Sequence, residues 1–516
     1  MAEAQQNSSQ ASLSLELKPK TSLIPLPGIE LFFGLVGPTG TDTNAVVAEL
    51  TEQLAAVGYE TQRVSLSDLI ARFSKSTPDG PTEYDRIKFL MKQGTAWREQ
   101  FEDGTFVARL AIAEIRAKRK ASHGEENKPL PTTAYILTSF KRPEEVQLFR
   151  DIYGKAFNLI SVYTSVDDRL MALSRRLAAS ARTPVSSVQH KALELINIDA
   201  TEEGTRFGQD VRDTFPLADY FVAMRDSHHL KAQLRRLVHL VFGNPYLTPT
   251  KDEYAMFFAM AAALRSGDLS RQVGVTIVSH EGEILSSGCN EVPKAGGGLY
   301  WSDDPSPKRD LELGYEKNAK VKQELLEDLL HRLRESNWLV SKFKADNLAA
   351  LVEKAIREKD APLKDCQLLD VIEYGRTVHA EMAAITDAAK RGLSIKGARL
   401  FTTTFPCHIC ARHIISSGIS EVSYIEPYPK SRTEELYSDS VVVNPTSPVS
   451  TLVNFFPFSG VAPRRYFDFF QVTEGRKSPK GEVLNWDGKR TQPKVKRFVP
   501  SYIALEQFVL DSFPGG

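Results

Sequence analysis

The chain has 516 residues and no formal net charge, because 65 Lys and Arg balance 65 Asp and Glu. This length predicts two or three domains, since a single hydrophobic core stops growing beyond about 250–300 residues. Hydrophobic residues make up 42% and charged residues 25% of the chain, which is ordinary for a globular protein and excludes disordered and collagen-like classes. The balanced charge gives no sign of a generally basic surface that would hold a nucleic acid polymer.

The cysteines and the hydropathy pattern indicate a cytoplasmic chain without a membrane partner. Four cysteines are too few for a disulfide scaffold of this size: Cys289, Cys366, Cys407 and Cys410. The N-terminus has no basic residue before Lys18 and no apolar run, so it does not resemble a secretory signal. The most apolar stretch, 254–264, is too short to span a bilayer. Reduced thiols in the cytoplasm act more often as ligands, nucleophiles or core residues than as bridges.

The first half of the chain has the pattern of a parallel sheet. Residues 1–27 are polar and are predicted to form a flexible tail. The apolar run 31–36 predicts a buried strand, and a Gly/Thr-rich turn and an amphipathic helix over 46–57 follow it. Further strands are predicted at 60–64, 134–138 and 157–163. Strands that alternate with helices indicate βαβ units, so we expect one α/β domain over 28–240.

A second α/β domain is expected over 250–516. A basic helical segment, 228–242, ends at the sequence GNP, which predicts a domain boundary near 243–249. The elements predicted beyond it are a helix at 254–264, strands at 272–278 and 283–287, a helix at 380–390, a strand at 398–404, a helix at 410–417 and a strand at 421–425. Charge-rich amphipathic helices indicate an insertion at 303–370. The aromatic-rich extension 433–516 is expected to pack on this second half or on a neighbouring subunit.

The sharpest chemical signal is the sequence HAE at 379–381 followed by PCHIC at 406–410. The pattern H-x-E then P-C-x-x-C is typical of zinc-dependent nucleobase deaminases. A catalytic zinc site takes three protein ligands and keeps one position open, and His379, Cys407 and Cys410 supply three. Two cysteines three residues apart at the start of a helix point to the same side. The alternative is a structural zinc site, which usually closes with four protein ligands.

Glu381 is the expected catalytic residue, because it follows His379 by two positions without being needed as a ligand. Two thiolates cancel the charge of the metal, so that a nearby base becomes more necessary. Glu381 is expected to take a proton from the attacking water and to pass protons to the cytosine ring and the leaving amine.

The second half, at about 250–432, resembles the deoxycytidylate deaminase branch of the cytidine deaminase superfamily. Three further stretches carry the resemblance: SRQVG at 270–274, SGCNEVP at 287–293 and YIEPYPKS at 424–431. The resemblance implies a three-layer α/β/α fold, and it implies that Asn290 hydrogen-bonds the deoxyribose or base. Arg271, Arg376 and Lys430 are candidates for the substrate phosphate, because phosphates need Arg or Lys donors.

The segment 34–43 of the first half, GLVGPTGTDT, resembles the phosphate-binding P-loop of nucleotide kinases. Its candidate nucleotide-binding residues are Gly37, Gly40, Thr41 and Thr43, and Lys141, Arg142, Arg169, Arg175 and Arg176 are further candidates for phosphate or for a kinase lid. The Lys that the motif requires is absent, which argues against phosphoryl transfer. Three interpretations stay open: a kinase, a nucleotide-sensing regulatory module, and a scaffold whose glycines only make a turn. We favour the regulatory module.

The whole arrangement resembles the bacterial anti-phage deoxycytidine nucleotide deaminases. The resemblance implies conversion of dCTP and dCMP to dUTP and dUMP, depletion of dCTP during infection, assembly into a homo-oligomer and, in some members, inhibition by a small RNA. The alternatives are a cytosine deaminase of single-stranded nucleic acid and a housekeeping dCMP deaminase that supplies dUMP under control of the kinase-like domain.

Overall fold

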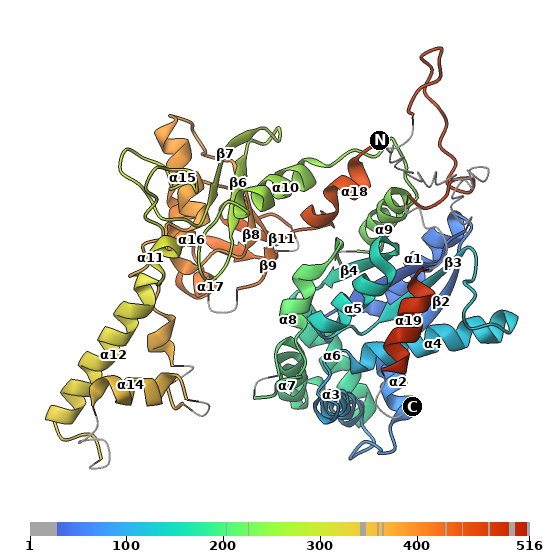
Figure 1. Ribbon diagram of the computed structural model, residues 1–516, viewed down its shortest axis with the longest axis horizontal. Helices are drawn as coiled ribbons and strands as arrows, with labels where there is room; N and C mark the ends of the chain where they lie inside the picture. The colour runs from blue at the N-terminus through green and yellow to red at the C-terminus, as the bar shows by residue number, and fades with distance from the viewer. Residues whose placement is uncertain are drawn as a thin grey trace, which may run out of the picture.

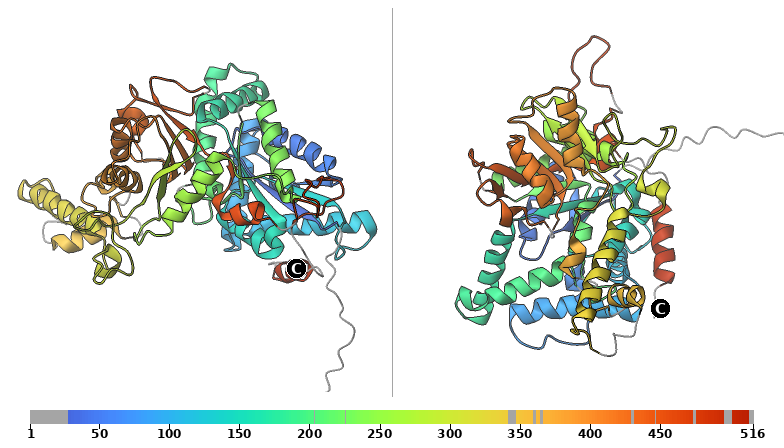
Figure 2. Two further views of the ribbon diagram at one scale, coloured as in Figure 1. Left: turned by 90° about the horizontal axis from the view of Figure 1, so that it is seen from above. Right: turned by 90° about the vertical axis from the view of Figure 1, so that its left-hand side faces the viewer.

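The computed structural model describes residues 28–512, except 203, 225, 341–346, 359–360, 364–365, 429–430, 446, 473–474 and 495–500. The predicted tail, 1–27, lies outside the described residues. Figure 1 shows two α/β bodies side by side, with helices α12 (Lys317–Glu335) and α14 (Leu348–Ile356) projecting from the second body as an arm. Seen from above, the arm lies at the end of the molecule farthest from the first body (Figure 2). No helix among the described residues is both long enough and apolar enough to cross a membrane.

The first body is built on a six-stranded sheet of order β12-β5-β4-β1-β3-β2. Its strands are β1 (Leu31–Val36), β2 (Glu60–Ser65), β3 (Thr133–Thr138), β4 (Phe157–Tyr163), β5 (Tyr220–Ala223) and β12 (Gly460–Val461). The first five are parallel, as the alternating pattern predicted. Every residue of β1 and β3 is buried, because helices cover both faces and both strands are almost continuously apolar.

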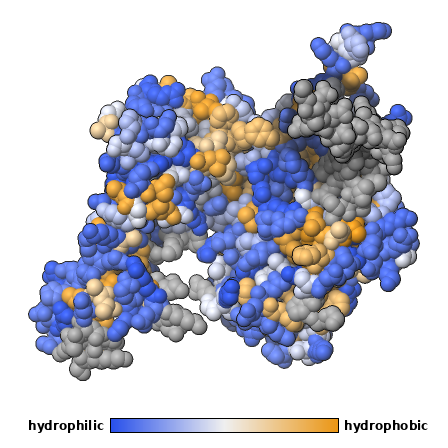
Figure 3. Space-filling model, viewed as in Figure 1, coloured by the Kyte–Doolittle hydropathy of each residue, from blue (hydrophilic) through white to orange (hydrophobic). Residues whose placement is uncertain are grey.

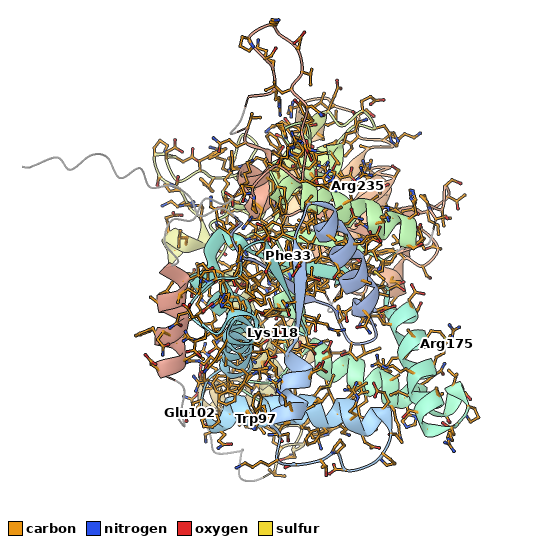
Figure 4. All side chains as sticks on the ribbon, turned by 90° about the vertical axis from the view of Figure 1, so that its right-hand side faces the viewer. Phe33, Trp97, Glu102, Lys118, Arg175 and Arg235 are labelled. Carbon is orange, nitrogen blue, oxygen red and sulfur yellow. The ribbon has the colours of Figure 1, made fainter. Side chains whose placement is uncertain are left out.

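The helices of the first body connect these strands. They are α1 (Thr43–Ala56), α2 (Leu66–Phe73), α3 (Glu83–Gln100), α4 (Phe106–His123), α5 (Pro143–Tyr153), α6 (Val166–Ala181), α7 (Gln189–Ala200), α8 (Val211–Thr214) and α9 (Ser227–Val241). Three 3₁₀ turns, Gly154–Ala156, Val185–Ser187 and Phe215–Leu217, complete the connections. In Figure 4, Phe33 of β1 lies at the centre of this body, where the sheet buries it completely.

The second body is built on a sheet of order β10-β11-β9-β8-β6-β7. Its strands are β6 (Gly274–Val278), β7 (Ile284–Cys289), β8 (Arg399–Thr404), β9 (Glu421–Glu426), β10 (Val441–Val443) and β11 (Val453–Pro457). The four strands β8 to β11 run parallel, and β6 pairs antiparallel with both β7 and β8. Its helices are α10 (Lys251–Ala263), α15 (Ala380–Lys390), α16 (His408–Ser416) and α17 (Thr433–Leu436).

Two glycines let helices approach this sheet from opposite faces. A Cβ on Gly274 of β6 would lie 1.9 Å from the Ala259 carbonyl oxygen of α10, and a Cβ on Gly288 of β7 would lie 2.5 Å from the Ala380 carbonyl oxygen of α15. Gly288 pairs with Val275, the residue after Gly274, so the two glycines face opposite sides of the sheet. The body is therefore the α/β/α sandwich that was predicted, and the α/β fold class is confirmed.

The inserted arm has a small core of its own. It contains α11 (Asp310–Leu313), α12, α14 and the 3₁₀ turn Gln367–Asp370. Leu326 and Leu330 of α12 pack on Leu351 and Val352 of α14. The amphipathic helices predicted inside 303–370 are therefore present, and they are stabilised by each other rather than by the sheet.

The C-terminal extension divides between the two bodies, whereas we expected it to pack on the second half or on a neighbouring subunit. Strands β10 and β11 extend the second sheet, but β12 pairs antiparallel with β5 of the first sheet, and α19 (Ser501–Asp511) packs on α4 and α5. Figure 1 shows α19 beside α4 at the outer face of the first body. Glu506 of α19 explains the docking: it is buried, and it accepts hydrogen bonds from Arg119 of α4 at 2.5 and 2.9 Å.

The two bodies share one carboxylate at the place where the chain crosses between them. Glu253 of α10 is buried, and it accepts hydrogen bonds from Arg236 of α9 (2.6 Å) and from the backbone N–H of Val461 in β12 (3.0 Å). Hydrophobic side chains gather around α10, between the bodies (Figure 3). Met256 of α10 and Phe458, which precedes β12, belong to the same buried cluster as the first sheet. The two bodies are thus packed against each other.

Candidate functional site

Two helix N-termini bring the predicted zinc ligands together. His379 caps α15 and Cys407 caps α16, while Cys410 lies in the first turn of α16. The Nδ1 atom of His379 lies 3.3 Å from Sγ of Cys407 and 3.4 Å from Sγ of Cys410. In the part of the chain that the structure describes, these three residues form the only cluster of three or more possible ligands close enough to hold one metal ion.

The donor set and its spacing fit Zn²⁺. Tetrahedral zinc with Zn–S bonds of about 2.3 Å and Zn–N bonds of about 2.05 Å requires N···S separations of about 3.6 Å. The observed separations are within a few tenths of an ångström of that value. With one imidazole and two sulfurs, the cluster leaves the fourth position of a tetrahedron without a protein ligand.

The electrostatics of the cluster favour a thiolate. Hydrogen bonds from the Cys410 thiol and from His379 lower the pKa of Cys407, against the opposing effect of burial. The hydrogen bond to Cys407 raises the pKa of His379 to about 9. The thiolate is the form of cysteine that binds metal, and the free N–H groups of a helix N-terminus stabilise it further.

Glu381 lies in the first turn of α15, two residues after His379, and it lines the same cavity. Its side chain is almost fully buried, and this burial raises its pKa to about 7. A carboxyl group with such a pKa both accepts and releases a proton near neutral pH.

The cavity at this cluster has a volume of about 240 Å³. Besides His379, Glu381 and Cys407, it is lined by Asp268, Ser270, Arg271, Val273, Asn290, Asp310, Glu316, Asn318, Ile372, Gly375, Thr377, Ala380, Thr404, Phe405 and Tyr428. Asp310, Glu316 and Asn318 come from the arm, and sequence reasoning missed them. No local motif marks these residues, because contacts between distant segments bring them to the cavity: Asp310 accepts from Arg376, and Asn318 donates to the Val371 carbonyl.

Asn290 lines the cavity, with its side-chain amide bound to the backbone. Its Nδ2 donates to the carbonyl of Arg271 (2.7 Å), and its Oδ1 accepts from the N–H of Val273 (2.7 Å). The residue is buried, and it fixes the segment that carries Arg271. Each end of the amide keeps one further hydrogen-bonding position.

The three phosphate candidates lie in different surroundings. The Arg271 side chain lines the cavity, is 56% exposed and lies 3.5 Å from a Glu426 carboxylate oxygen. Arg376 does not line the cavity, because its guanidinium pairs with Asp310 (2.8 Å) and donates to the carbonyl of Lys308. Lys430 lies outside the described residues.

The loop predicted to bind phosphate in the first body is bound to an acid of its own chain. The Thr39 N–H donates to Oδ2 of Asp199 in α7 (2.7 Å), and Lys141 Nζ donates to Oδ1 of the same carboxylate (2.6 Å). Gly40 has a φ of 99°, and a Cβ there would lie 2.7 Å from the Arg169 carbonyl oxygen. The Asp199 carboxylate therefore accepts the hydrogen bond that the Thr39 N–H would otherwise donate to a phosphate.

The remaining loop candidates are also engaged locally. The Thr41 N–H donates to the Pro38 carbonyl and the Thr43 N–H to the Thr41 carbonyl, each at 3.0 Å. Gly37 is closely packed, since a Cβ there would lie 2.8 Å from the Thr43 methyl group. The loop thus has the predicted position between β1 and α1, with fewer free amides than a phosphate cradle offers.

Comparison with known proteins finds similarity in the second body. A family model described as the cytidine and deoxycytidylate deaminase zinc-binding region matches residues 249–426. A probable deoxycytidylate deaminase of Drosophila melanogaster is 30% identical over 174 residues, which are 34% of this chain and 58% of the fly protein. The deoxycytidylate deaminase of Enterobacteria phage T4 is 46% identical over 55 residues, 11% of this chain and 28% of the phage protein.

Among solved structures, a dCMP deaminase from cyanophage S-TIM5, in complex with dCMP and dUMP, aligns with a TM-score of 0.22 and 17% identity. The alignment covers 41% of this chain and 99% of the cyanophage protein. The present chain spans little more than half of the fly relative and about a quarter of the phage relative. The family match contains all three clustered ligands, so the zinc-binding region and the donor set together confirm the prediction of zinc.

Proposed function

We propose that the chain is a zinc-dependent hydrolase that deaminates deoxycytidine nucleotides, with dCMP and water giving dUMP and ammonia. One observation carries this proposal: His379, Cys407 and Glu381 line a single cavity large enough for a pyrimidine base. The similarity of residues 249–426 to cytidine and deoxycytidylate deaminases supports the same chemistry.

The residues of the cavity have different roles in the hydrolysis. His379, Cys407 and Cys410 would hold Zn²⁺, which when bound lowers the pKa of a water molecule and so supplies the nucleophile for C4 of the cytosine ring. Glu381 accepts a proton from that water and delivers protons to ring N3 and to the departing amine. Its burial suits this role, since a carboxyl that titrates near neutral pH works in both directions.

The nucleotide is held by residues on the other walls. Phe405 and Tyr428 provide aromatic surface for a planar base. Asn290 holds the backbone from Arg271 to Val273 in place and has a free hydrogen-bonding position for the sugar or base. Arg271 is exposed at the cavity, where its guanidinium can exchange Glu426 for a phosphate. Arg376 and Lys430 stay predictions for the same phosphate.

We further propose that dCTP is a substrate beside dCMP and that its depletion serves defence against phage. In this proposal the first body, with its loop at 37–43, is a regulatory rather than a catalytic unit, and a homo-oligomer and a small inhibitory RNA control activity. The absence of a lysine in the loop and the engagement of Lys141 by Asp199 support a non-catalytic role. Measuring dCTP pools during phage infection, with and without the chain, tests the proposal: unchanged pools would contradict it.

Turnover by the purified full chain tests the deaminase proposal. Zinc-loaded protein is incubated with dCMP, dCTP, CTP and cytidine, and uracil products are separated by chromatography. We expect uracil products from the deoxycytidine nucleotides and much slower reaction of cytidine, which lacks a phosphate for Arg271. No turnover of any deoxycytidine nucleotide would contradict the proposal. Deamination of a cytosine-containing single-stranded oligonucleotide at an equal rate would favour a polynucleotide deaminase instead.

A further inference from the structure

The first body contains a second cavity, of about 270 Å³, which the deaminase chemistry does not use. It opens where β1, β2 and β3 end, since residues just after each of these strands line it. In open α/β sheets, ligands bind at the carboxyl ends of the strands beside the point where the strand order reverses. Here that point is at β1, which lies between β3 and β4.

The charged residues of this second cavity are nearly all basic. Its charged lining residues are Arg63, Arg86, Arg98, Lys141, Arg176 and Asp68. Four of the cations pair with nearby acids: Lys141 pairs with Asp199, Arg98 pairs with Glu145, and Arg86 and Arg176 share Glu83. Arg63 has no acid partner among the described residues, and Arg98 keeps two unused hydrogen-bond donors.

Arg98 is the most informative residue of the cavity. It is 1% exposed, and its Nη2 donates to Glu145 at 2.7 Å. Its Nε and Nη1 atoms are buried without a hydrogen-bond partner in the described part of the chain. A buried charged donor without a partner is strongly unfavourable, so these two N–H groups call for an acceptor.

Other groups around Arg98 complete a site for an anion. The Thr41 hydroxyl lines the cavity and is likewise buried without a partner among the described residues. Arg63 forms no ion pair in the described part of the molecule and lies two residues before Ser65, whose hydroxyl lies 3.1 Å from that of Ser67. Ser139, at the end of β3, has a φ of 74°, a strained backbone conformation that is common at ligand sites.

We propose that this cavity binds the phosphate of a nucleotide-sized molecule, with Arg98 and Thr41 at its inner end and Arg63 at its opening. The planar guanidinium of Arg98 presents two donors side by side, which matches two oxygens of one phosphate. The cavity is as large as the one at the zinc cluster, which leaves room for a nucleoside beyond the phosphate. The site lies beside the loop at 37–43 and not on its amides, because Asp199 already occupies the Thr39 N–H.

Calorimetric titration of the full chain tests the site without any enzyme assay. The probes are inorganic phosphate, pyrophosphate and dUMP, added to the unaltered chain and to the variants Arg63→Gln and Thr41→Val. We expect each variant to bind pyrophosphate about tenfold more weakly, a loss of about 1.4 kcal/mol. The control is Arg235→Gln, because Arg235 is an exposed cation of α9 and does not line the cavity. We expect the control to bind as the unaltered chain does.

The outcomes separate this site from the zinc cavity. Unchanged pyrophosphate affinity in both Arg63→Gln and Thr41→Val would overturn the proposal, since the anion would then bind elsewhere. The nucleotide part of the proposal would be overturned if dUMP bound no more tightly than inorganic phosphate and if Arg63→Gln left both affinities unchanged. Arg98→Met should abolish binding, but it leaves Glu145 buried without its partner and can unfold the body. Tungstate soaked into crystals of the unaltered chain therefore gives a direct check: we expect an anomalous peak at Arg98, and a peak only at Arg271 would contradict the site.

Discussion

The two loop–helix sites of this chain differ in what they offer a ligand. At α15 and α16, the functional atoms are side chains at helix N-termini, and the three ligand atoms lie within 4.8 Å of one another. At α1, the functional atoms would be backbone amides, and a remote carboxylate, Asp199, has taken one of them. A motif of side chains at fixed spacing thus predicts its chemistry from the local sequence alone. A motif of backbone amides does not, because residues from elsewhere in the chain can form hydrogen bonds with those amides.

Removal of one metal ligand should have the largest effect. Cys410→Ser replaces a buried sulfur of the cluster, and we expect loss of bound zinc and of all deaminase activity, because two ligands hold the metal far more weakly. Metal content by mass spectrometry and turnover of dCMP measure both. The matched control is Cys366→Ser, a thiol outside the cluster, which should keep zinc and activity. Full zinc content in Cys410→Ser would show that Cys410 is not a ligand.

Glu381→Gln should separate the base from the metal. We expect turnover to fall about 10³-fold, within the usual contribution of general acid–base catalysis, while zinc content is unchanged. Glu283→Gln, at an exposed turn before β7, is the control and should react at the normal rate. If Glu381→Gln retained activity, the proton would have to move through another group of the cavity.

Arg119→Met tests the buried ion cluster of Arg119, Glu30 and Glu506, which holds the C-terminal helix α19 on the first body. The substitution leaves Glu30 and Glu506 buried without their cation, and we expect the first body to lose about 3–5 kcal/mol of unfolding free energy. Urea unfolding of the full chain measures the loss. Arg109→Met also removes a contact to α19, at the Val509 carbonyl, but it is partly exposed and should cost only about 1 kcal/mol. Equal losses in the two variants would mean that the buried ion cluster adds nothing specific.

Asp199→Ala should cost less stability than Arg119→Met, and it tests the comparison of the two sites directly. Its carboxylate is 1% exposed and holds both Thr39 and Lys141, so we expect a loss of about 1–3 kcal/mol. The substitution also frees the amide and the ammonium group, and pyrophosphate should then bind several-fold more tightly. If its affinity does not rise, the loop lacks a phosphate geometry even when it is empty.

Sequence reasoning succeeded where the signal was local. The alternation of apolar runs and amphipathic helices predicted β1 to β4 and β6 to β9, four strands of each sheet, but not β5, β10, β11 or β12. Helix α15 begins and ends at the predicted residues. The three-residue spacing of Cys407 and Cys410 at the start of a helix predicted that both sulfurs point to the same side.

What it missed depends on contacts between segments far apart in the chain. Asp199 and Thr39 are 160 positions apart, and Glu506 and Arg119 are 387 apart. No periodicity records such pairs, because each residue alone is an ordinary polar or charged residue. For the same reason, the sequence analysis assigned the whole of 433–516 to the second half of the chain. In the structure, strand β12 and the buried Glu506 of α19 bind the later part of this extension to the first body.

The position of Glu253 has a mechanical consequence. The chain passes between the bodies twice, from α9 to α10 and from β11 to β12, and the Glu253 carboxylate binds residues on both passages. Two chain crossings that lie far apart would form a hinge with a fixed axis. Here both crossings are joined at one carboxylate, so that rotation of one body against the other would centre on that point. A change in the tilt of the first body relative to the second would therefore act on α10, which packs against β6, the strand after Arg271, and against β7, the strand before Asn290.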